Sequence, residues 1–433
     1  MIERSLRMRA LALVCVAFTG PVAADEGVPV EARYQLEVAE LMADPRLQAG
    51  FRHVVDIEDQ SRADLIELTE IPAPPFKESR RAERFAELLR EAGLTDVRID
   101  QEGNAIGRRP GRTGKRTVAY SAHLDTVFPE GTDVTVHVED GRMYAPGIGD
   151  NSRGLVTVLG VLRAMQYAGI ETEADVLFVG NVGEEGLGDL RGMKYLFRDT
   201  GPGIDALIAV DGGRSDRIVY GGVGSHRYRI TFRGPGGHSW GAFGGANPIH
   251  ALGRTIALFD ARAPEVTSEG EKSSYNVGRI GGGTSVNSIP FEAWAEVDIR
   301  SGDPAKVARI DEILEVAVAE ALADENGGRT MGPALTVDIE QVGNRPAARG
   351  DASSPLVQRA MAATLAFDIE PSLRISSTDA NLPLSLGIPA VTMSRGGVSA
   401  NSHSPSEWWE NVDGHLAIQI GLLTLVAEAG LAR

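Results

Sequence analysis

The pattern of apolar and polar positions changes twice along the chain. Residues 30–41, 56–69 and 79–92 are predicted helices, and a proline-rich break, IPAPPF, precedes the third. Beyond them, short apolar runs typical of buried strands alternate with helical segments. The predicted strands and helices lie at residues 117–127, 155–168, 174–182, 192–197 and 205–211. Such alternation predicts an α/β fold with a mixed, mainly parallel sheet and helices on both faces.

The middle of the chain follows a different order. A strand, a helix, two strands, a helix and a final strand are predicted at residues 226–233, 248–261, 274–280, 291–300, 304–323 and 334–341. This βαββαβ order is that of a ferredoxin-like domain. A helix at 354–366 and a strand at 388–393 then return to the alternation of helices and strands seen before residue 222. We therefore expect one domain formed by residues 25–222 and 343–433, and a second, which we call the lid domain, inserted at residues 223–342.

The N-terminal segment has the pattern of a secretory signal peptide. Three arginines among the first nine residues precede an apolar stretch at 10–18 and then the small residues of PVAAD. The apolar stretch is too short to span a bilayer. We therefore expect cleavage near Ala24, which makes residues 1–24 a signal peptide. The mature protein would be exported, to the periplasm or the extracellular space, without a membrane anchor.

Cysteine content and net charge exclude several kinds of site and one kind of partner. Cys15 is the only cysteine, so a chain cleaved near Ala24 has none, which excludes disulfides, a cysteine nucleophile and thiolate metal ligands. Any metal must then be held by histidine, aspartate and glutamate. The formal net charge of −17 argues against nucleic acid as a partner, because phosphate backbones require clustered lysine and arginine. A length of 433 residues is consistent with two domains.

A scattered set of acids and histidines follows the predicted strands. The residues at or just beyond strand ends are His123, Asp125, Glu184, Glu185, Asp211 and His403. Open α/β sheets place their ligand crevice at that edge. Asp150 lies in GIGDNSRG, a glycine-rich loop that leads into a helix. Taken singly, Asp150 could be a helix N-cap and the glutamate pair a solvated turn. Their joint placement favours a metal site.

Metal-assisted hydrolysis needs these residue types. Zinc binds imidazole nitrogen and carboxylate oxygen, and a catalytic zinc keeps one position open for water. Two neighbouring metals need a bridging carboxylate and together lower the pKa of a shared water. Another carboxylate must then carry the proton from that water to the leaving amine. Glu184 and Glu185 are adjacent, so their side chains diverge and one can bind metal while the other faces the substrate.

Six motifs resemble those of a known enzyme family. SAHLDTV, GIGDNSRG, GNVGEEGLGD, AVDGG, GPGGHSW and NSHSPSE are similar, in order and spacing, to the motif series of the metallopeptidases that include peptidase T, aminoacylase-1 and bacterial glutamate carboxypeptidase. The resemblance covers nearly all of the mature chain, including the lid domain. It implies two Zn²⁺ ions that share Asp150, with the remaining ligands His123 and Asp211 for one ion and Glu185 and His403 for the other.

The resemblance also implies roles for two further acids. Glu184 would act as general base and then as general acid. Asp125 would accept the second ring N–H of His123 and fix the orientation of that ring. Co²⁺ or Mn²⁺ would also fit, because sites of histidine and carboxylate accept several divalent metals.

The lid domain would supply groups that contact the substrate. In the family, the histidine of GPGGHSW, here His238, reaches the active site of the partner subunit and stabilises the oxyanion. Asn287 and Arg300 match the family's substrate contacts. Without the resemblance, His238 would be an ordinary loop histidine and Arg300 a solvated side chain. We therefore expect a homodimer formed through the lid domain and a small peptide-like substrate.

The expected activity is hydrolysis of an amide bond in a small peptide, by a dipeptidase, tripeptidase or exopeptidase. In the family, aspartate at the position of Asp211 is more frequent in aminopeptidases and dipeptidases, whereas carboxypeptidases and aminoacylases more often carry glutamate. The alternatives are an N-acyl amino acid amidohydrolase or a carboxypeptidase. More remote is a non-catalytic binding protein on the same scaffold, which would usually have lost the base or a ligand.

Overall fold

One eight-stranded sheet forms the centre of the larger domain. The computed structural model describes residues 28–433, so the predicted signal peptide and its cysteine lie outside the described residues. In spatial order the strands are β1 (Asp96–Ile99), β2 (Ala105–Arg109), β6 (Asp175–Asn181), β3 (Thr117–His123), β7 (Ala206–Val210), β16 (Ala390–Met393), β8 (Arg217–Gly222) and β15 (Ser372–Ser376). The central strands β6, β3, β7 and β16 pair in parallel, and antiparallel pairs join β1 to β2, β2 to β6 and β8 to β16. The predicted mainly parallel sheet is confirmed.

Helices cover both faces of this sheet. Along β3, Val118 and Tyr120 belong to a large core on one face, and Ala119 belongs to a smaller core on the other. Because successive strand side chains point to opposite faces, a continuous apolar run can serve both cores. The smaller core contains α6 (Arg191–Leu196). The helices of the large core are α1 (Ala32–Ala43), α2 (Pro45–Asp56), α3 (Glu58–Thr69), α4 (Ser79–Glu91), α5 (Gly154–Tyr167), α10 (Pro355–Leu365) and α12 (Gly414–Ala429).

Several elements are not predicted by the sequence pattern. Helix α12 is buried along almost its whole length, so it is apolar on all sides and lacks helical periodicity. Helix α2 follows α1 after a single residue, Asp44, whose side chain accepts a hydrogen bond from the amide of Arg46. The small sheet beside the central one consists of β17 (Val398–Ala400), β18 (Trp408–Glu410), β5 (Arg142–Tyr144) and β4 (His137–Glu139). Strands of three residues are too short to leave an alternating pattern.

The lid domain is a four-stranded antiparallel sheet with helices on one face. Its elements are β9 (Gly224–Arg233), α7 (Pro248–Arg262), α8 (Pro264–Thr267), β11 (Ser273–Gly282), β13 (Glu292–Ser301), α9 (Pro304–Gly327) and β14 (Thr336–Arg345), and the strand order is β11-β13-β9-β14. This arrangement confirms the predicted ferredoxin-like βαββαβ unit. Phe232, Phe259 and Leu314 form part of a separate core between sheet and helices. Alternate residues of β13 are buried, as expected for a sheet covered on one face only.

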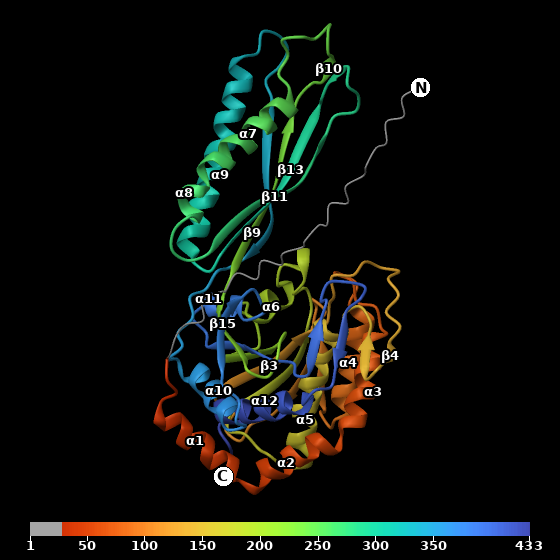
Figure 1. Ribbon diagram of the computed structural model, residues 1–433, viewed down its shortest axis with the longest axis vertical. Helices are drawn as coiled ribbons and strands as arrows, with labels where there is room; N and C mark the ends of the chain where they lie inside the picture. The colour runs from red at the N-terminus through yellow and green to blue at the C-terminus, as the bar shows by residue number, and fades with distance from the viewer. Residues whose placement is uncertain (1–27) are drawn as a thin grey trace, which may run out of the picture.

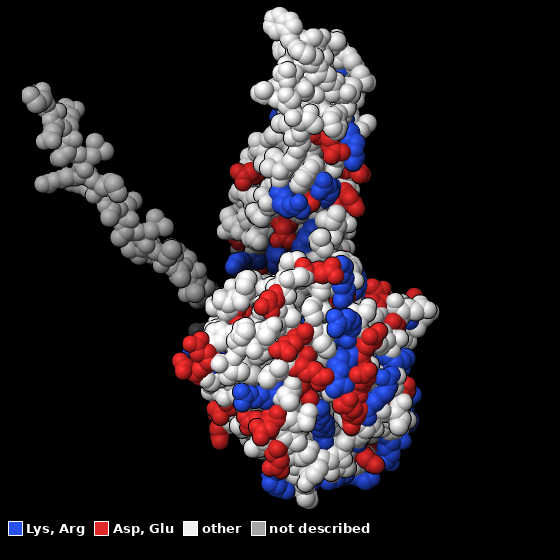
Figure 2. Space-filling model, turned by 90° about the vertical axis from the view of Figure 1, so that its right-hand side faces the viewer, with Lys and Arg blue, Asp and Glu red and all other residues white. Residues whose placement is uncertain are grey.

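The lid domain projects from the larger domain, and strands β9 and β14 run down toward the junction (Figure 1). The predicted bounds at residues 223 and 342 stay a prediction; the strands at the junction begin at Gly224 and end at Arg345. Short strands β10 (Gly237–His238) and β12 (Ser288–Ile289) pair at the far tip of the lid domain. Figure 2 shows that this far half carries few charged residues on the face in view. Within residues 28–433, none of the helices has the length and apolar character needed to cross a membrane.

Candidate metal centre

Three neighbouring strands end beside one another and carry the candidate residues. β3 ends at His123, β7 is followed at once by Asp211, and β6 is followed after a short turn by Glu184 and Glu185. Because β6, β3 and β7 are adjacent and parallel, their carboxyl ends meet at one edge of the sheet. The strand order therefore brings together residues that lie far apart in the sequence.

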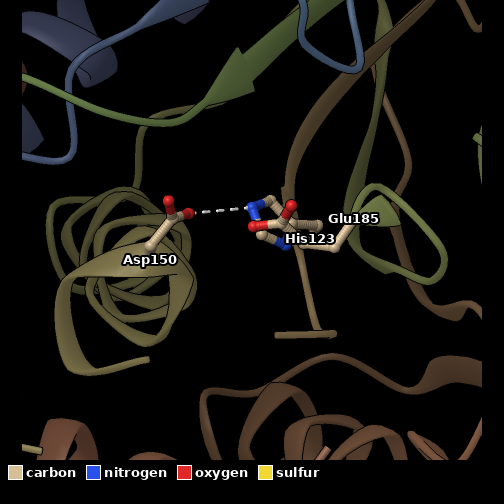
Figure 3. Close-up of side chains that lie close together, drawn as sticks. All are labelled: His123, Asp150 and Glu185. Carbon is tan, nitrogen blue, oxygen red and sulfur yellow. Dashed lines mark ion pairs between the residues drawn. The ribbon is translucent and has the colours of Figure 1, made fainter. Parts of the chain in front are cut away.

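Asp150 lies between the two histidines of the site. It belongs to η1 (Ile148–Arg153), the irregular turn that leads into α5. Its Oδ1 atom is 3.3 Å from Nε2 of His123, and its Oδ2 atom is 3.5 Å from Nε2 of His403. Figure 3 shows the Asp150 carboxylate directed toward the His123 ring, with Glu185 close to the same ring. A carboxylate whose two oxygens face two different imidazoles has the arrangement of a bridging ligand.

Glu185 and His403 complete the second half of the cluster. Oε1 of Glu185 is 2.9 Å from Nε2 of His403. One ligand atom each from His123, Asp150 and Glu185 lies within 4.8 Å of the others. The side chain of His403 is 54 % exposed, whereas that of Glu185 is 9 % exposed. The cluster is therefore buried on the sheet side and open on the side of His403.

Asp211 is joined to Asp150 by an arginine. Nη1 of Arg395 lies 3.3 Å from Oδ1 of Asp150 and 3.5 Å from Oδ1 of Asp211. Burial, together with the nearby Asp150 carboxylate, raises the pKa of Asp211. Although burial also disfavours the charged form of Asp150, the Arg395 guanidinium and the two histidines hold its pKa well below the ordinary value. Arg395 thus partly neutralises two acids that would otherwise repel each other.

The donor set is one that divalent metal ions accept. Two imidazole nitrogens and three carboxylates converge, with no thiolate. Nε2 of His123 is buried and has no hydrogen-bond partner among the described residues, so it is available as a ligand. Burial alone would lower the pKa of His123, but Asp125 and Asp150 raise it well above the ordinary value, which reflects concentrated negative charge around the ring.

Asp125 lies beside both the His123 ring and the turn that carries Glu184 and Glu185. Nδ1 of His123 lies 3.0 Å from the backbone carbonyl oxygen of Asp125 and 3.6 Å from its carboxylate. The carboxylate also accepts hydrogen bonds from the backbone amides of Glu184, at 3.1 Å, and Glu185, at 2.7 Å. The Asp125 side chain therefore fixes the turn that carries the two glutamates, and its role in orienting the His123 ring stays a prediction.

Glu184 faces an arginine at the end of β14, where the lid domain joins the larger domain. Nη1 of Arg345, the last residue of β14, donates a hydrogen bond of 2.8 Å to Oε1 of Glu184 and another of 3.0 Å to Oγ of Ser377. Both charged side chains are less than 10 % exposed. Burial raises the pKa of Glu184 well above its ordinary value, although Arg345 opposes the rise. A carboxylate whose pKa is raised by burial can take a proton and return it more readily than an exposed one.

Four residues around the site are missed by sequence reasoning: Arg345, Asp379, Arg395 and Glu407. Asp379 is 3 % exposed and accepts a hydrogen bond of 2.9 Å from Asn181, and burial raises its pKa to about 7. Glu407 accepts hydrogen bonds from the backbone amides of Gly147, Gly149 and Asp150, at 2.9, 2.9 and 2.8 Å. Burial raises the pKa of Glu407 to about 7, and the amides oppose that rise. Glu407 ends the motif NSHSPSE, which marks the loop but not these contacts, whereas Asp379 lies outside the six motifs.

The lid residues predicted to contact substrate are not gathered at this cluster. His238 lies on β10 at the far tip of the lid domain, and its Nδ1 atom accepts a hydrogen bond from the amide of Trp240. Asn287 is also at the tip, where its side chain accepts from Ser285. Arg300 lies on β13 and forms an exposed ion pair of 2.7 Å with Asp298. In one chain, therefore, His238 and Asn287 are remote from the metal ligands.

Comparisons with known proteins find a sequence relative and solved structures that share the fold. Succinyl-diaminopimelate desuccinylase of Paracoccus denitrificans is 27% identical over 255 residues, which cover 55% of this chain and 67% of that protein. The aminopeptidase PepT of Bacillus cereus has the same fold, with a TM-score of 0.68 at 21% identity over 86% of this chain and 98% of that one. So has the YxeP protein of Bacillus subtilis, a dinuclear metal binding peptidase, with a TM-score of 0.62 at 17% identity over 88% of this chain and 99% of that one.

The match to a family model covers most of the chain. The model for peptidase family M20/M25/M40 matches residues 119–429, which include the strand-end acids, the lid domain and the final helix. The chain therefore belongs to peptidase family M20/M25/M40.

Proposed function

We propose that this protein is a dinuclear zinc hydrolase that cleaves the amide bond of a small peptide, with Glu184 as general base. The observation that carries the proposal is the position of Asp150, whose two oxygens face His123 and His403 while Glu184 remains outside that contact. The residues that would hold the metals are His123, Asp150 and Asp211 for one ion and Asp150, Glu185 and His403 for the other. Bound zinc would lower the pKa of a shared water and polarise the substrate carbonyl.

Glu184 would move the protons. Its carboxylate is buried, its pKa is raised, and its contact with Arg345 keeps one oxygen in a fixed direction. From this position it would take a proton from the attacking water and deliver it to the leaving amine. Asp125 supports this role, since its carboxylate holds the amides of Glu184 and Glu185. With the turn fixed in this way, Glu184 can serve as the base while Glu185 serves as a metal ligand.

Replacing Glu184 with glutamine should separate catalysis from metal binding. Glu184→Gln keeps the size of the side chain but removes the basic oxygen, so turnover should fall by about 10²–10⁴-fold while zinc content stays unchanged. Zinc content and the rate of dipeptide hydrolysis measure the two effects. Glu139→Gln, on exposed β4, is the control and should retain full activity. Near-normal turnover of Glu184→Gln would remove this residue as the base.

Glu407 is proposed to position Asp150. Its carboxylate accepts three backbone amides from the loop at 147–150, and one of them belongs to Asp150 itself. A glutamine offers one carbonyl oxygen and introduces two N–H donors that would face those amide donors. The loop would then lose its fixed conformation, and the shared carboxylate would lose its position between the metals.

Glu407→Gln should therefore weaken metal binding. We expect zinc affinity to fall by about 10–100-fold, the usual effect of removing a group that orients a ligand. Titration of the metal-free protein with zinc against a chromogenic chelator measures this. Glu410→Gln is the matched control, because Glu410 lies three residues further on and pairs with Arg142 on the surface. An unchanged zinc affinity in folded Glu407→Gln would contradict the assignment.

The lid domain is proposed to complete the active site of a partner subunit. His238 and Asn287 are remote from the metal ligands of their own chain, and the tip of the lid domain exposes large apolar side chains. Trp240, Phe243 and Val286 are 88, 83 and 102 % exposed. Exposed apolar patches of this kind mark sites of association. A homodimer formed through the lid domains would cover them and could bring His238 to the other subunit, where it would stabilise the oxyanion.

Mixed dimers test this sharing. His238→Ala and Glu184→Gln should each be inactive alone, but in a mixed dimer one site would combine an intact Glu184 with an intact His238 from the other subunit. Activity should therefore reappear on mixing. Mixing His238→Ala with the double variant His238→Ala/Glu184→Gln is the control, and should restore nothing. If confirmed mixed dimers of the single variants stay inactive, the shared site is wrong.

The preferred substrate is proposed to be a free dipeptide or tripeptide. The aspartate at position 211 supports a peptidase, as implied by the family resemblance, whereas the similarity to a desuccinylase favours an N-acyl amino acid amidohydrolase as the second candidate. The signal-peptide pattern at residues 1–24 supports a proposed role outside the cytoplasm.

A hydrolysis screen of the zinc-loaded protein decides between the candidates. Free dipeptides, tripeptides, N-acetyl amino acids and N-blocked dipeptides would be compared by kcat/KM. We expect the free peptides to be cleaved fastest. Faster cleavage of N-acetyl amino acids would establish the amidohydrolase instead, and release of C-terminal residues from N-blocked dipeptides would establish a carboxypeptidase.

A further inference from the structure

The two halves of the proposed metal centre offer the same kinds of donor. Beside the shared carboxylate of Asp150, each half has one imidazole and one further carboxylate. The pairs are His123 with Asp211 and His403 with Glu185. Donor type therefore gives no reason for one zinc ion to bind more tightly than the other. The charge around the ligands does differ between the halves, and the difference comes from Arg395.

The guanidinium of Arg395 lies against ligand oxygens of the first pair. Its Nη1 atom is 3.3 Å from Oδ1 of Asp150 and 3.5 Å from Oδ1 of Asp211. The same Oδ1 atom of Asp150 is 3.3 Å from Nε2 of His123 (Figure 3). The other oxygen of Asp150, Oδ2, faces His403. A zinc ion held by His123 and Asp211 would therefore share its oxygen ligands with a fixed positive charge.

Arg395 is held firmly in this position. Its side chain is 4 % exposed, and its Nη2 atom donates to the hydroxyls of Ser399, at 3.3 Å, and Ser402, at 3.5 Å. Its amide donates to the carbonyl oxygen of Gly212 at 3.2 Å, and its carbonyl oxygen accepts from the hydroxyl of Thr157 at 3.0 Å. Arginine also stays protonated in proteins. The guanidinium therefore keeps its charge, and moving it into solvent would break these contacts.

The other half has an arginine nearby, but that arginine is paired elsewhere. Nη1 of Arg345 donates to Glu184 at 2.8 Å and to Ser377 at 3.0 Å. Within residues 28–433, Glu185 forms an ion pair with His403 and none with a lysine or arginine. An arginine therefore contacts the proposed ligand oxygens in the half formed by His123 and Asp211, whereas the ligand that completes the other half, Glu185, has no such contact.

We propose that Arg395 lowers the zinc affinity of the half formed by His123 and Asp211, so that zinc fills the half formed by Glu185 and His403 first. This inference rests on the proposed function, because it concerns the two metals of that site. Repulsion between a guanidinium and a divalent cation is strong where water is excluded, and it opposes binding by at least about tenfold. At zinc concentrations between the two dissociation constants, the protein would hold one ion and lack the second that the proposed hydrolysis needs.

Zinc binding to the metal-free protein tests this proposal without measuring turnover. Titration against a chromogenic chelator should give two zinc ions per chain, with dissociation constants at least about tenfold apart. The stoichiometry reports on the proposed dinuclear site and the gap between the constants reports on Arg395, so the two ideas can fail separately. A single zinc ion per chain would remove the dinuclear site, whereas two ions of equal affinity would overturn only the role of Arg395.

Variants assign the gap to one charge. Arg395→Gln removes the charge and should tighten the weaker site by at least about tenfold, whereas Arg395→Lys keeps the charge and should keep the gap. Arg214→Gln is the matched control, because Arg214 lies three residues beyond Asp211 with its side chain 83 % exposed, and both constants should stay unchanged. An unchanged or weaker second site in folded Arg395→Gln, or a gap that closes equally in Arg395→Lys, would overturn the proposal.

Crystals of the unaltered protein locate the first ion. With about one equivalent of zinc per chain, the stronger anomalous peak should lie beside Glu185 and His403, and the weaker one beside His123 and Asp211. This measurement does not depend on a variant, so it decides the question if Arg395→Gln fails to fold, as judged by circular dichroism. Equal peaks, or a stronger peak beside Asp211, would overturn the proposal.

Discussion

Concentrated negative charge at one edge of the sheet is the constraint that organises this protein. Five acids, Asp125, Asp150, Glu184, Glu185 and Asp211, are gathered where three parallel strands end. Their mutual repulsion and their loss of water oppose folding unless positive charge or hydrogen-bond donors offset them. Two arginines supply positive charge at this edge. Arg395 lies between Asp150 and Asp211, and Arg345 pairs with Glu184. The remaining imbalance is one that divalent cations would relieve.

Hydrogen bonds from backbone amides help to fix the positions of the proposed metal ligands. The carboxylate of Asp125 holds the amides of Glu184 and Glu185, and the carboxylate of Glu407 holds three amides of the loop that carries Asp150. In both places a buried acid that would not bind metal orients one that would. The proposed ligands therefore sit on loops, but on loops held by charge-assisted hydrogen bonds, which are stronger than neutral ones.

Much of this arrangement follows from the sequence, because strand ends can be located from apolar runs and α/β sheets place their sites there. The βαββαβ order of the lid domain also follows from the sequence, because strand-like and helix-like patterns of apolar residues occur there in that order. Other contacts have no local signal. Arg345 and Glu184 are 161 positions apart, and Glu407 and Asp150 are 257 positions apart, so only the folded chain joins them. Helix α12 lacks periodicity because it is buried all round. The hydrogen bonds of the Asp125 carboxylate to the amides of Glu184 and Glu185 depend on a turn whose backbone conformation the sequence pattern does not specify.

The central claim is that Asp150 is shared by two metal ions. Crystals of the zinc-loaded protein, measured on both sides of the zinc absorption edge, test it most directly because the anomalous signal locates zinc without reference to activity. The account predicts two zinc peaks, one beside each oxygen of Asp150, with His123 and Asp211 on one and Glu185 and His403 on the other. A single peak, or two peaks of which only one contacts Asp150, would contradict it.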